Sequence, residues 1–412
     1  MNVIEVRLWG QTLGALAWNE ETSTADFEYS EEFLKTGIKV NPMAQVTHIT
    51  KSVKGGTYKG LPPFIAESLP DNFGSGLINA YFARKGQHNI NVLDKLCYVG
   101  EKGMGAMTFH PTSDNETHGI IHLSKIVEQA KLALSGNLNE QPSHAIDEII
   151  SAGVSAGGAK AKAIIAYNEE TGEIKSGIKS YKGFTDLIIK FDGVSDNHRK
   201  KPEYGRIEYA YYLMAKAAGI NISKSNLIEE GKSAHFITER FDRVCGEKLH
   251  MLSLCGMSSL DFRLEGAHSY EQYFSVTRDL LTDSEATQEA IRRCFFNVLS
   301  ANPDDHTKNV SFLMSKDGRW SLAPAYDMTY SFNQSIPWTH NHQMSVNGKT
   351  SKITKEDLII SASKFIKRDK SVAVLNKVIG AINDWHSFAG KAGVSEAAAI
   401  AIGDNQLSSE IF

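Results

Sequence analysis

Strand-like and helix-like patterns are unevenly distributed along this chain of 412 residues. Before Cys255 the sequence contains several short apolar segments separated by glycine, proline or polar turns, whereas the pattern after Cys255 is mostly helical. Segregated strands and helices are typical of α+β folds, and the chain is too long for one comfortable core. We therefore predict an α+β protein with two or three subdomains.

The first 150 residues predict a small β-rich part. Residues 3–18 alternate around a Gly-Gln turn, which indicates a hairpin. Residues 70–86 predict a helix that begins after a proline and ends at a glycine, and residues 93–111 return to a strand-like alternation. Polar stretches flank a further predicted helix over residues 123–134, so the first subdomain is placed at residues 1–115.

The next hundred residues have an informative order of elements. A glycine-bearing loop runs into an apolar strand, and a second strand, a helix and two more strands follow, over residues 154–167, 184–191, 203–219, 226–230 and 233–244. This order predicts a second subdomain over residues 116–243 and a mostly helical part over residues 244–412.

Composition excludes several classes of protein. The net charge of −4 gives no overall attraction to nucleic acid or anionic membrane. We find no apolar run of 18 residues and no signal-peptide core at the start, so we expect a cytoplasmic protein that does not span a membrane. Four cysteines without a C-x-x-C pair predict buried thiols in a reducing compartment.

The loop before residue 160 is rich in small residues. Ser155, Ala156, Gly157, Gly158 and Ala159 let backbone N–H groups approach a phosphate closely. The loop is not a Walker motif, because that motif requires a lysine after its second glycine, and it is not G-x-G-x-x-G. Most such loops are ordinary turns, so this signal alone decides nothing.

Lys190 lies within the apolar run "LIIKF". A buried lysine is costly unless an anion meets it, although a strand-edge lysine can extend its ammonium to water. Both interpretations stay open for the residue taken alone. The functional one is the protein-kinase pattern, in which a strand lysine holds ATP phosphates and pairs with a glutamate on the next helix, here Glu208.

The stretch "NPDDHTKNVSFL" contains an aspartate and an asparagine separated by four residues. Asp304 and Asn309 have the spacing of the kinase catalytic loop, and Asp327 follows a later apolar strand where a second magnesium ligand is expected. An isolated match of this kind usually reflects a capped turn. The whole set, in the right order along the chain, favours kinase-like chemistry.

Two departures distinguish the chain from typical protein kinases. Asn302-Pro303 stands where they carry His-Arg, and Asp-Met-Thr stands where they carry Asp-Phe-Gly. The sequence resembles instead the HipA family, the serine/threonine-kinase toxins of bacterial HipBA toxin–antitoxin modules. The resemblance runs nearly end to end, through "LWGQTLGAL", "ESLPDN", "VSAGGAKAK", "DLIIKF", "ITERFDR", "NPDDHTKN" and "APAYDMTYS".

The resemblance implies a two-lobed, protein-kinase-like α+β fold with a small β-rich N-terminal subdomain and a mostly helical C-terminal lobe. It implies that Asp304 is the catalytic base, that Asn309 and Asp327 hold Mg²⁺, and that Ser155 is autophosphorylated, with Ser151 as a neighbouring alternative. The implied ATP-binding residues are Gly157, Gly158, Ala159, Lys160, Ala161, Lys162, Lys190, Glu239, Arg240, Phe241, His306, Thr307, Lys308 and Tyr326.

The resemblance also implies partners. These are a separate helix-turn-helix antitoxin of the HipB type, operator DNA reached through that antitoxin, and a protein substrate, for which some relatives use an aminoacyl-tRNA synthetase. Lys349 and Lys352 begin a basic stretch that either contacts DNA phosphates or is a solvated face interrupted by acids. The alternatives for the whole chain are a catalytically idle co-repressor and a small-molecule kinase.

Overall fold

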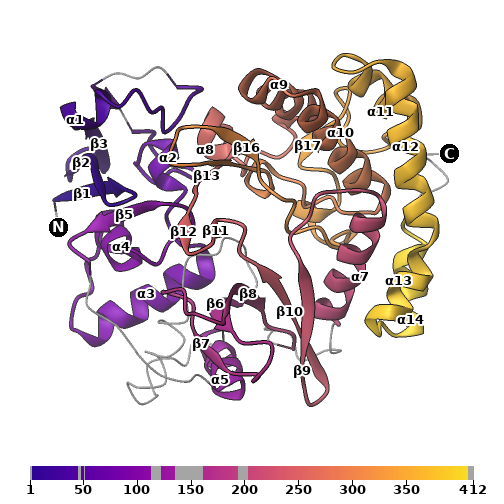
Figure 1. Cartoon of the computed structure of the whole chain (residues 1–412), viewed down its shortest axis with the longest axis horizontal. Coiled ribbons are helices and arrows are strands. Elements are labelled where there is room, and N and C mark those ends of the chain that lie inside the picture. Colours follow the sequence, from indigo (N-terminus) through magenta and orange to yellow (C-terminus); the bar gives the residue numbers. More distant parts are fainter. Residues whose placement is uncertain are drawn as a thin grey trace. The chain divides into compact units, whose positions relative to one another are not determined.

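A computed structural model describes residues 2–44, 48–50, 52–112, 122–134, 161–193 and 203–406. The chain divides into two compact units. Figure 1 labels the helices and strands along the chain. The first unit comprises Met1–Pro202, Asn226–Leu252 and Leu313–Arg319, and the second comprises Glu203–Ser225, Ser253–Phe312 and Trp320–Phe412. The three-part division at residues 115 and 243 stays a prediction.

The N-terminal sheet of the first unit has the strand order β4-β3-β2-β1-β5. Its strands are β1 (Val3–Leu8), β2 (Gln11–Asn19), β3 (Thr24–Tyr29), β4 (Ile49–Thr50) and β5 (Met107–His110). The predicted hairpin is confirmed, but its turn is Trp9-Gly10, with φ of 50° and 81°. Two consecutive positive φ angles match the twist of antiparallel strands, which explains the glycine at this turn.

Helices α1 (Glu31–Leu34), α2 (Pro63–Ala66), α3 (Asn72–Arg84) and α4 (Val92–Val99) accompany this sheet. The helix predicted over residues 70–86 is confirmed as α3. The strand-like interpretation of residues 93–111 was wrong for its first half, where α4 forms. Asn91 and Asp94 make a reciprocal capping box, and Leu93, Leu96 and Cys97 are buried at helical spacing.

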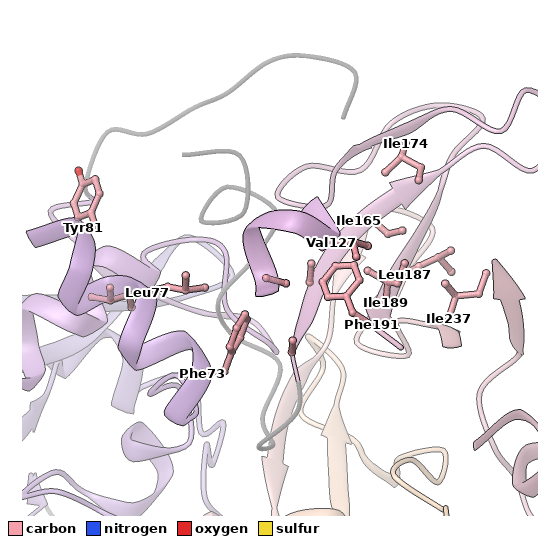
Figure 2. Close-up of a cluster of buried hydrophobic side chains, with 14 of the residues drawn as sticks. Phe73, Leu77, Tyr81, Val127, Ile165, Ile174, Leu187, Ile189, Phe191 and Ile237 are labelled. Carbon is pink, nitrogen blue, oxygen red and sulfur yellow. The ribbon is translucent and has the colours of Figure 1, made fainter. Parts of the chain in front are cut away.

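A second sheet in the first unit has the order β7-β6-β8-β10-β9. Its strands are β6 (Lys162–Tyr167), β7 (Ile174–Ser176), β8 (Thr185–Lys190), β9 (Ser225–Glu230) and β10 (Ser233–Glu239). Figure 2 shows Phe73 and Leu77 of α3 and Val127 of α5 (Leu123–Leu134) in one buried cluster with Ile165 and Ile189 of this sheet. Each such side chain stabilises the fold by about 1.5–3 kcal/mol on burial, so the cluster fixes these helices and strands together.

A short hairpin follows β10. Strands β11 (Arg243–Val244) and β12 (Glu247–Lys248) are joined by Cys245 and Gly246, whose φ angles are 51° and 82°. The prediction that all four cysteines are buried was wrong for Cys245, which is exposed because a two-residue turn projects its side chains into solvent. Cys97, Cys255 and Cys294 are buried as predicted.

The second unit is mostly helical, as predicted. Its helices are α7 (Tyr204–Ala217), α8 (Leu254–Ser258), α9 (Tyr270–Leu281), α10 (Ser284–Leu299), α11 (Lys355–Ser363), α12 (Arg368–Asn383), α13 (Trp385–Ala392) and α14 (Glu396–Gly403). Tyr211 is buried against Phe296 and Trp385, with ring centroids 6.1 and 5.4 Å away. This aromatic contact joins α7, α10 and α13 in one core.

Short elements complete the description. They are strands β13 (His250–Ser253), β14 (His268–Ser269), β15 (Ser311–Met314), β16 (Trp320–Leu322) and β17 (Met344–Ser345) and the 3₁₀ turns η2 (Thr307–Asn309) and η3 (Pro337–Thr339). Strands β14 and β17 pair in parallel. Within the described ranges, no helix has the length and apolar character needed to cross a bilayer.

A buried histidine makes the first unit sensitive to acid. His250 is fully buried with its ring Nε2 3.2 Å from the carbonyl oxygen of Val40, and burial lowers its pKa to about 4. Between this value and the unfolded pKa of about 6.5, the unfolded chain binds more protons, so stability falls as the pH drops. Urea unfolding at pH 7 and pH 5 should show a loss of about 2 kcal/mol from this group. The His250→Gln variant should lack that part of the pH dependence, and an unchanged dependence would contradict the assignment.

Candidate active site

One small pocket of the second unit is lined by several residues from the segments 302–310 and 325–328 and from helices α9 and α10. Its lining includes Tyr270, Tyr273, Arg293, Asn297, Asn302, Asp304, Asp305, Asn309, Val310, Ala325, Tyr326, Asp327 and Met328. The predicted base Asp304 and the predicted metal ligands Asn309 and Asp327 therefore share one cavity. This proximity is what their predicted roles in one site require.

Asp304 follows α10 in an irregular loop, and its side chain is 40% exposed. The backbone N–H of Asp304 donates to the Ser331 hydroxyl at 3.1 Å, and its Oδ1 accepts a hydrogen bond from the Trp338 indole at 2.7 Å. Burial raises the pKa of this carboxyl, while His306 and the Trp338 N–H act in the opposite direction. These hydrogen bonds fix Asp304 in position, while its carboxylate remains accessible to solvent.

His306 lies beside Asp304, with its Nε2 3.7 Å from Asp304 Oδ1. Burial lowers the pKa of His306, which favours the neutral imidazole. Its ring packs 5.0 Å from Phe262, and Lys308 Nζ lies 5.3 Å from the same phenyl ring. Thr307 donates its hydroxyl hydrogen bond to the Leu260 carbonyl at 2.8 Å, which fastens the loop to the segment after α8.

Asn309 and Asp327 present oxygen atoms of different kinds. The Asn309 amide Nδ2 donates to the backbone carbonyl of Asp304 at 2.8 Å, so the amide oxygen is its remaining acceptor. Asp327 has a φ of 52°, in the left-handed region that aspartate enters more readily than most residues. Tyr326 fixes the neighbourhood by donating to the Lys308 carbonyl at 2.6 Å and sharing a hydrogen bond with Ser311.

The oxygen donors of the pocket suit a hard divalent cation such as Mg²⁺. Among the residues that the structure describes, no three His, Cys, Asp or Glu side chains form a complete metal cluster. Mg²⁺ in phosphoryl-transfer enzymes is typically held by one or two protein carboxylates, with substrate phosphates and waters completing the shell. One carboxylate and one amide, from Asp327 and Asn309, fit that kind of site.

Asp305 is a pocket residue that sequence reasoning missed. It is 2% exposed, and its carboxylate accepts hydrogen bonds from the Tyr270 hydroxyl at 2.8 Å and from the Gln343 backbone N–H at 2.8 Å. His342 Nδ1 lies 2.7 Å from the same carboxylate. Asp305 thereby anchors the loop that carries Asp304. The adjacent acids in "PDDH" are the only sequence signal, and spacing alone does not reveal which one is buried.

The first unit holds the predicted phosphate-binding lysine. Lys190 lies directly opposite Lys162 on the neighbouring strand, so both side chains leave the same face of the sheet. Lys162 is 5% exposed with its Nζ 3.9 Å from an Asp71 oxygen, and Lys190 Nζ lies 5.6 Å from the Phe236 ring. The Asp71 carboxylate already faces the ammonium group of Lys162 on this side of the sheet. The predicted pairing of Lys190 with Glu208 of the second unit stays a prediction.

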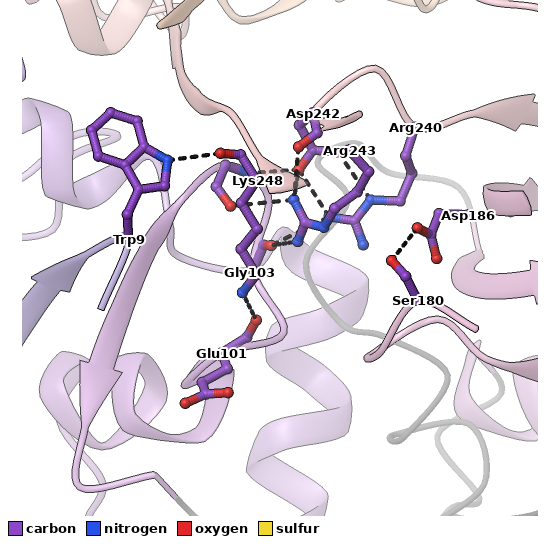
Figure 3. Close-up of polar contacts among 10 residues, drawn as sticks. Trp9, Glu101, Gly103, Ser180, Asp186, Arg240, Asp242, Arg243 and Lys248 are labelled. Atoms are coloured by element: carbon purple, nitrogen blue, oxygen red, sulfur yellow. Dashed lines mark hydrogen bonds and ion pairs between the residues drawn. The ribbon is translucent and has the colours of Figure 1, made fainter. Parts of the chain in front are cut away.

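The predicted adenine hinge begins at the end of β10. Arg240 is buried, and its guanidinium is committed to Asp242, with Nε 3.0 Å from Oδ1 and Nη2 2.9 Å from Oδ2 (Figure 3). Its backbone N–H donates to the Asp186 carbonyl at 2.9 Å. The Arg240 guanidinium is therefore committed to contacts within the protein and does not face a nucleotide.

Asp242 joins this hinge to the loop after α4. Its carboxylate also binds Arg243 Nη1 at 2.6 Å and the Gly105 N–H at 2.8 Å, and Arg243 Nη2 donates to the Gly103 carbonyl at 3.1 Å (Figure 3). Burial disfavours the charged form of Asp242, but the two guanidinium groups outweigh it and keep its pKa below the ordinary value. The sequence did not single out Asp242, because its role depends on a loop 137 residues away.

Most of the predicted phosphate-binding loop lies outside the described residues. Gly157, Gly158, Ala159, Lys160 and Ser155 lie outside the described residues, whereas Ala161 is buried at the start of the sheet.

The basic stretch after residue 348 is largely neutralised by acids. Lys349 pairs with Asp357 at 2.7 Å, Lys364 with Glu271 at 3.4 Å and Arg368 with Glu356 at 2.9 Å, while Lys352 is exposed. This compensation favours the solvated-face interpretation.

Comparisons with known proteins cover most of the chain. A model described as the HipA N-terminal domain matches residues 4–110, and one described as the HipA-like C-terminal domain matches residues 154–406. The chain is 22% identical over 377 residues to the serine/threonine-protein kinase toxin HipA of Shewanella oneidensis, covering 84% of this chain and 80% of the relative. It is 29% identical over 175 residues to a putative kinase of Haemophilus influenzae, covering 36% of this chain and 51% of that protein.

A solved structure has a similar fold. The Shewanella oneidensis HipA, in its complex with HipB and operator DNA, matches with a TM-score of 0.68 at 16% identity, covering 99% of this chain and 96% of that chain. The similarity confirms the predicted α+β fold class.

Proposed function

The chain belongs to the HipA family, and we propose that it is an ATP- and Mg²⁺-dependent serine/threonine protein kinase that acts as the toxin of a HipBA-type module. The observation that carries this proposal is the shared pocket of Asp304, Asn309 and Asp327. These are the residue types that phosphoryl transfer requires, namely a carboxylate for the attacking hydroxyl and oxygen ligands for the cation.

The proposed roles rest on the resemblance to the HipA family and on the shared pocket. Asp304 orients the serine or threonine hydroxyl and accepts its proton, the γ-phosphoryl group passes to that oxygen, and ADP leaves. Asn309 and Asp327 would hold Mg²⁺, which neutralises charge on the phosphates when bound. Lys190, with Lys162 opposite it, offers positive charge to the phosphates.

The remaining predicted ATP contacts keep their proposed roles. Glu239, Arg240 and Phe241 would surround adenine, His306, Thr307, Lys308 and Tyr326 would line the nucleotide site, and the loop from Gly157 would cover the phosphates. Ser155 would be the autophosphorylated residue. A phosphoserine there adds up to two negative charges, which would repel ATP phosphates and silence the kinase.

The proposed partners come from the relatives. The Shewanella oneidensis HipA was solved with HipB and operator DNA, which supports a HipB-type helix-turn-helix antitoxin as the partner of this chain. Operator DNA would then be reached through the antitoxin. The substrate would be a bacterial protein such as an aminoacyl-tRNA synthetase.

Removing a proposed metal ligand should change the magnesium requirement. In the Asp327→Asn variant we expect the Mg²⁺ concentration for half-maximal transfer of phosphate from ATP to rise at least about tenfold, because a neutral amide binds the cation more weakly. The matched control is Asp317→Asn, since Asp317 is an exposed turn residue paired with Arg319. Equal magnesium requirements in the two variants would contradict the assignment, and transfer without any divalent cation would contradict the proposed chemistry.

A further inference from the structure

Trp338 contacts Asp304 from a separate segment of the second unit. It belongs to η3 (Pro337–Thr339), and its indole Nε1 donates to Asp304 Oδ1 at 2.7 Å. His306 Nε2 lies 3.7 Å from the same oxygen. A fixed donor that hydrogen-bonds one oxygen of a carboxylate restricts the rotation of that carboxylate. The contact thereby presents Oδ2 as the oxygen that a substrate hydroxyl meets.

A closed ring of hydrogen bonds holds Trp338 in place. The Gln343 side-chain amide donates to the Trp338 carbonyl, and the Gln343 backbone N–H donates to Asp305 Oδ1 at 2.8 Å. Asp305 is the chain neighbour of Asp304, which accepts the hydrogen bond of the Trp338 indole. The ring is therefore closed by the backbone between Asp304 and Asp305. His342 adds a second contact to Asp305 at 2.7 Å. The segment from Trp338 to Gln343 is therefore fastened to both adjacent aspartates.

Ring packing sets the direction of the indole N–H. The Trp338 ring lies edge-on to Phe262, with centroids 6.3 Å apart and an interplanar angle of 87°, and its centroid is 6.0 Å from that of His306. Trp338 itself is only partly buried. A partly buried loop tryptophan could point its N–H at water, but here two aromatic neighbours and a backbone brace direct it to a carboxylate.

We propose that Trp338 is a positioning residue for the kinase reaction, whose indole N–H holds the Asp304 carboxylate in the orientation that meets the acceptor hydroxyl. The inference deepens the proposed function and rests on it. A misplaced catalytic group costs up to about 100-fold in rate, so the effect should be visible in kcat.

Two substitutions distinguish the role of the Trp338 N–H from the role of its aromatic ring. Trp338→Phe keeps an aromatic ring beside Phe262 and removes the donor. Trp338→His loses more ring surface but keeps an N–H at the equivalent ring position, because Nε2 of histidine and Nε1 of tryptophan are both two bonds from Cγ. Trp385→Phe is the matched control, since the Trp385 indole is 2% exposed and donates to the Ala399 carbonyl at 2.9 Å.

The measurement is kcat and KM for ATP with casein as the acceptor protein, together with the melting temperature of each variant. We expect Trp338→Phe to lower kcat by about tenfold or more with KM for ATP unchanged. Trp338→His should retain a higher kcat than Trp338→Phe. Trp385→Phe should lower the melting temperature and leave kcat unchanged.

The remaining outcomes overturn the inference in distinguishable ways. A wild-type kcat in Trp338→Phe, or a phenylalanine variant more active than the histidine variant, would show that the N–H does not position Asp304. If Trp338→Phe also melted at a lower temperature, and the loss of folded protein accounted for its lower kcat, Trp338 would have a structural role. No phosphate transfer by the wild-type chain, to casein or to itself, would remove the proposed function and this inference with it.

Discussion

The Asp304→Asn variant is expected to transfer phosphate about 10²–10⁴-fold more slowly than the wild-type chain. An amide has nearly the shape of the carboxylate and can still accept the Trp338 hydrogen bond, which in the wild type is 2.7 Å long. It does not accept a proton from the attacking hydroxyl, so the loss falls on the chemical step. Single-turnover transfer from labelled ATP measures this step directly.

Binding of ATP should survive the same substitution. The rise in melting temperature with Mg-ATP should be retained in Asp304→Asn, because the proposed metal ligands Asn309 and Asp327 are unchanged. Asp279→Asn is the matched control, since Asp279 is an exposed carboxylate paired with Arg278 on α9. Transfer at the wild-type rate by Asp304→Asn would show that another group acts as the base.

The Asp242→Ala variant should strongly destabilise the first unit. It leaves two guanidinium groups, from Arg240 and Arg243, without their shared carboxylate, and the Asp242 side chain is fully buried. Breaking a buried ion pair by removing one partner typically costs about 3–5 kcal/mol, because the remaining charge stays desolvated. Urea unfolding of the whole chain should show this loss in the transition of the first unit.

An exposed ion pair provides the control for this effect. Asp317 pairs with Arg319, whose side chain is 84% exposed, so Asp317→Asn should leave the stability nearly unchanged, because water screens an exposed ion pair. If both variants were equally stable, the Asp242 cluster would not fix the hinge to the loop at Gly103 and Gly105. The difference between the two variants is more informative than either value alone.

Local features of the fold were predictable because their causes are local. Glycine at a two-residue turn predicted the N-terminal hairpin, and an apolar run with one lysine predicted the strand that carries Lys190. Helix α4 was missed because the capping box of Asn91 and Asp94 outweighs the apparent alternation of the residues that follow. In that segment, two hydrogen-bonded side chains decided between helix and strand.

The candidate site was predictable only in part. The spacing of Asp304 and Asn309 identified the loop, because the kinase catalytic loop carries both residue types separated by four residues. Trp338 and Asp305 escaped notice because their contacts join residues more than 30 positions apart. The position of Lys162 directly across from Lys190 depends likewise on the register of strands β6 and β8. Such contacts are fixed by tertiary structure and leave no periodic pattern in the sequence.

The most direct test of the proposed function is the intact mass of the wild-type chain after incubation with Mg-ATP, followed by peptide mapping. The account predicts a species that carries one added phosphate, mapped to Ser155, and its absence in the Asp304→Asn variant. No added phosphate on the chain or on casein, together with no change of melting temperature with Mg-ATP, would contradict the kinase and leave a co-repressor that binds antitoxin and DNA.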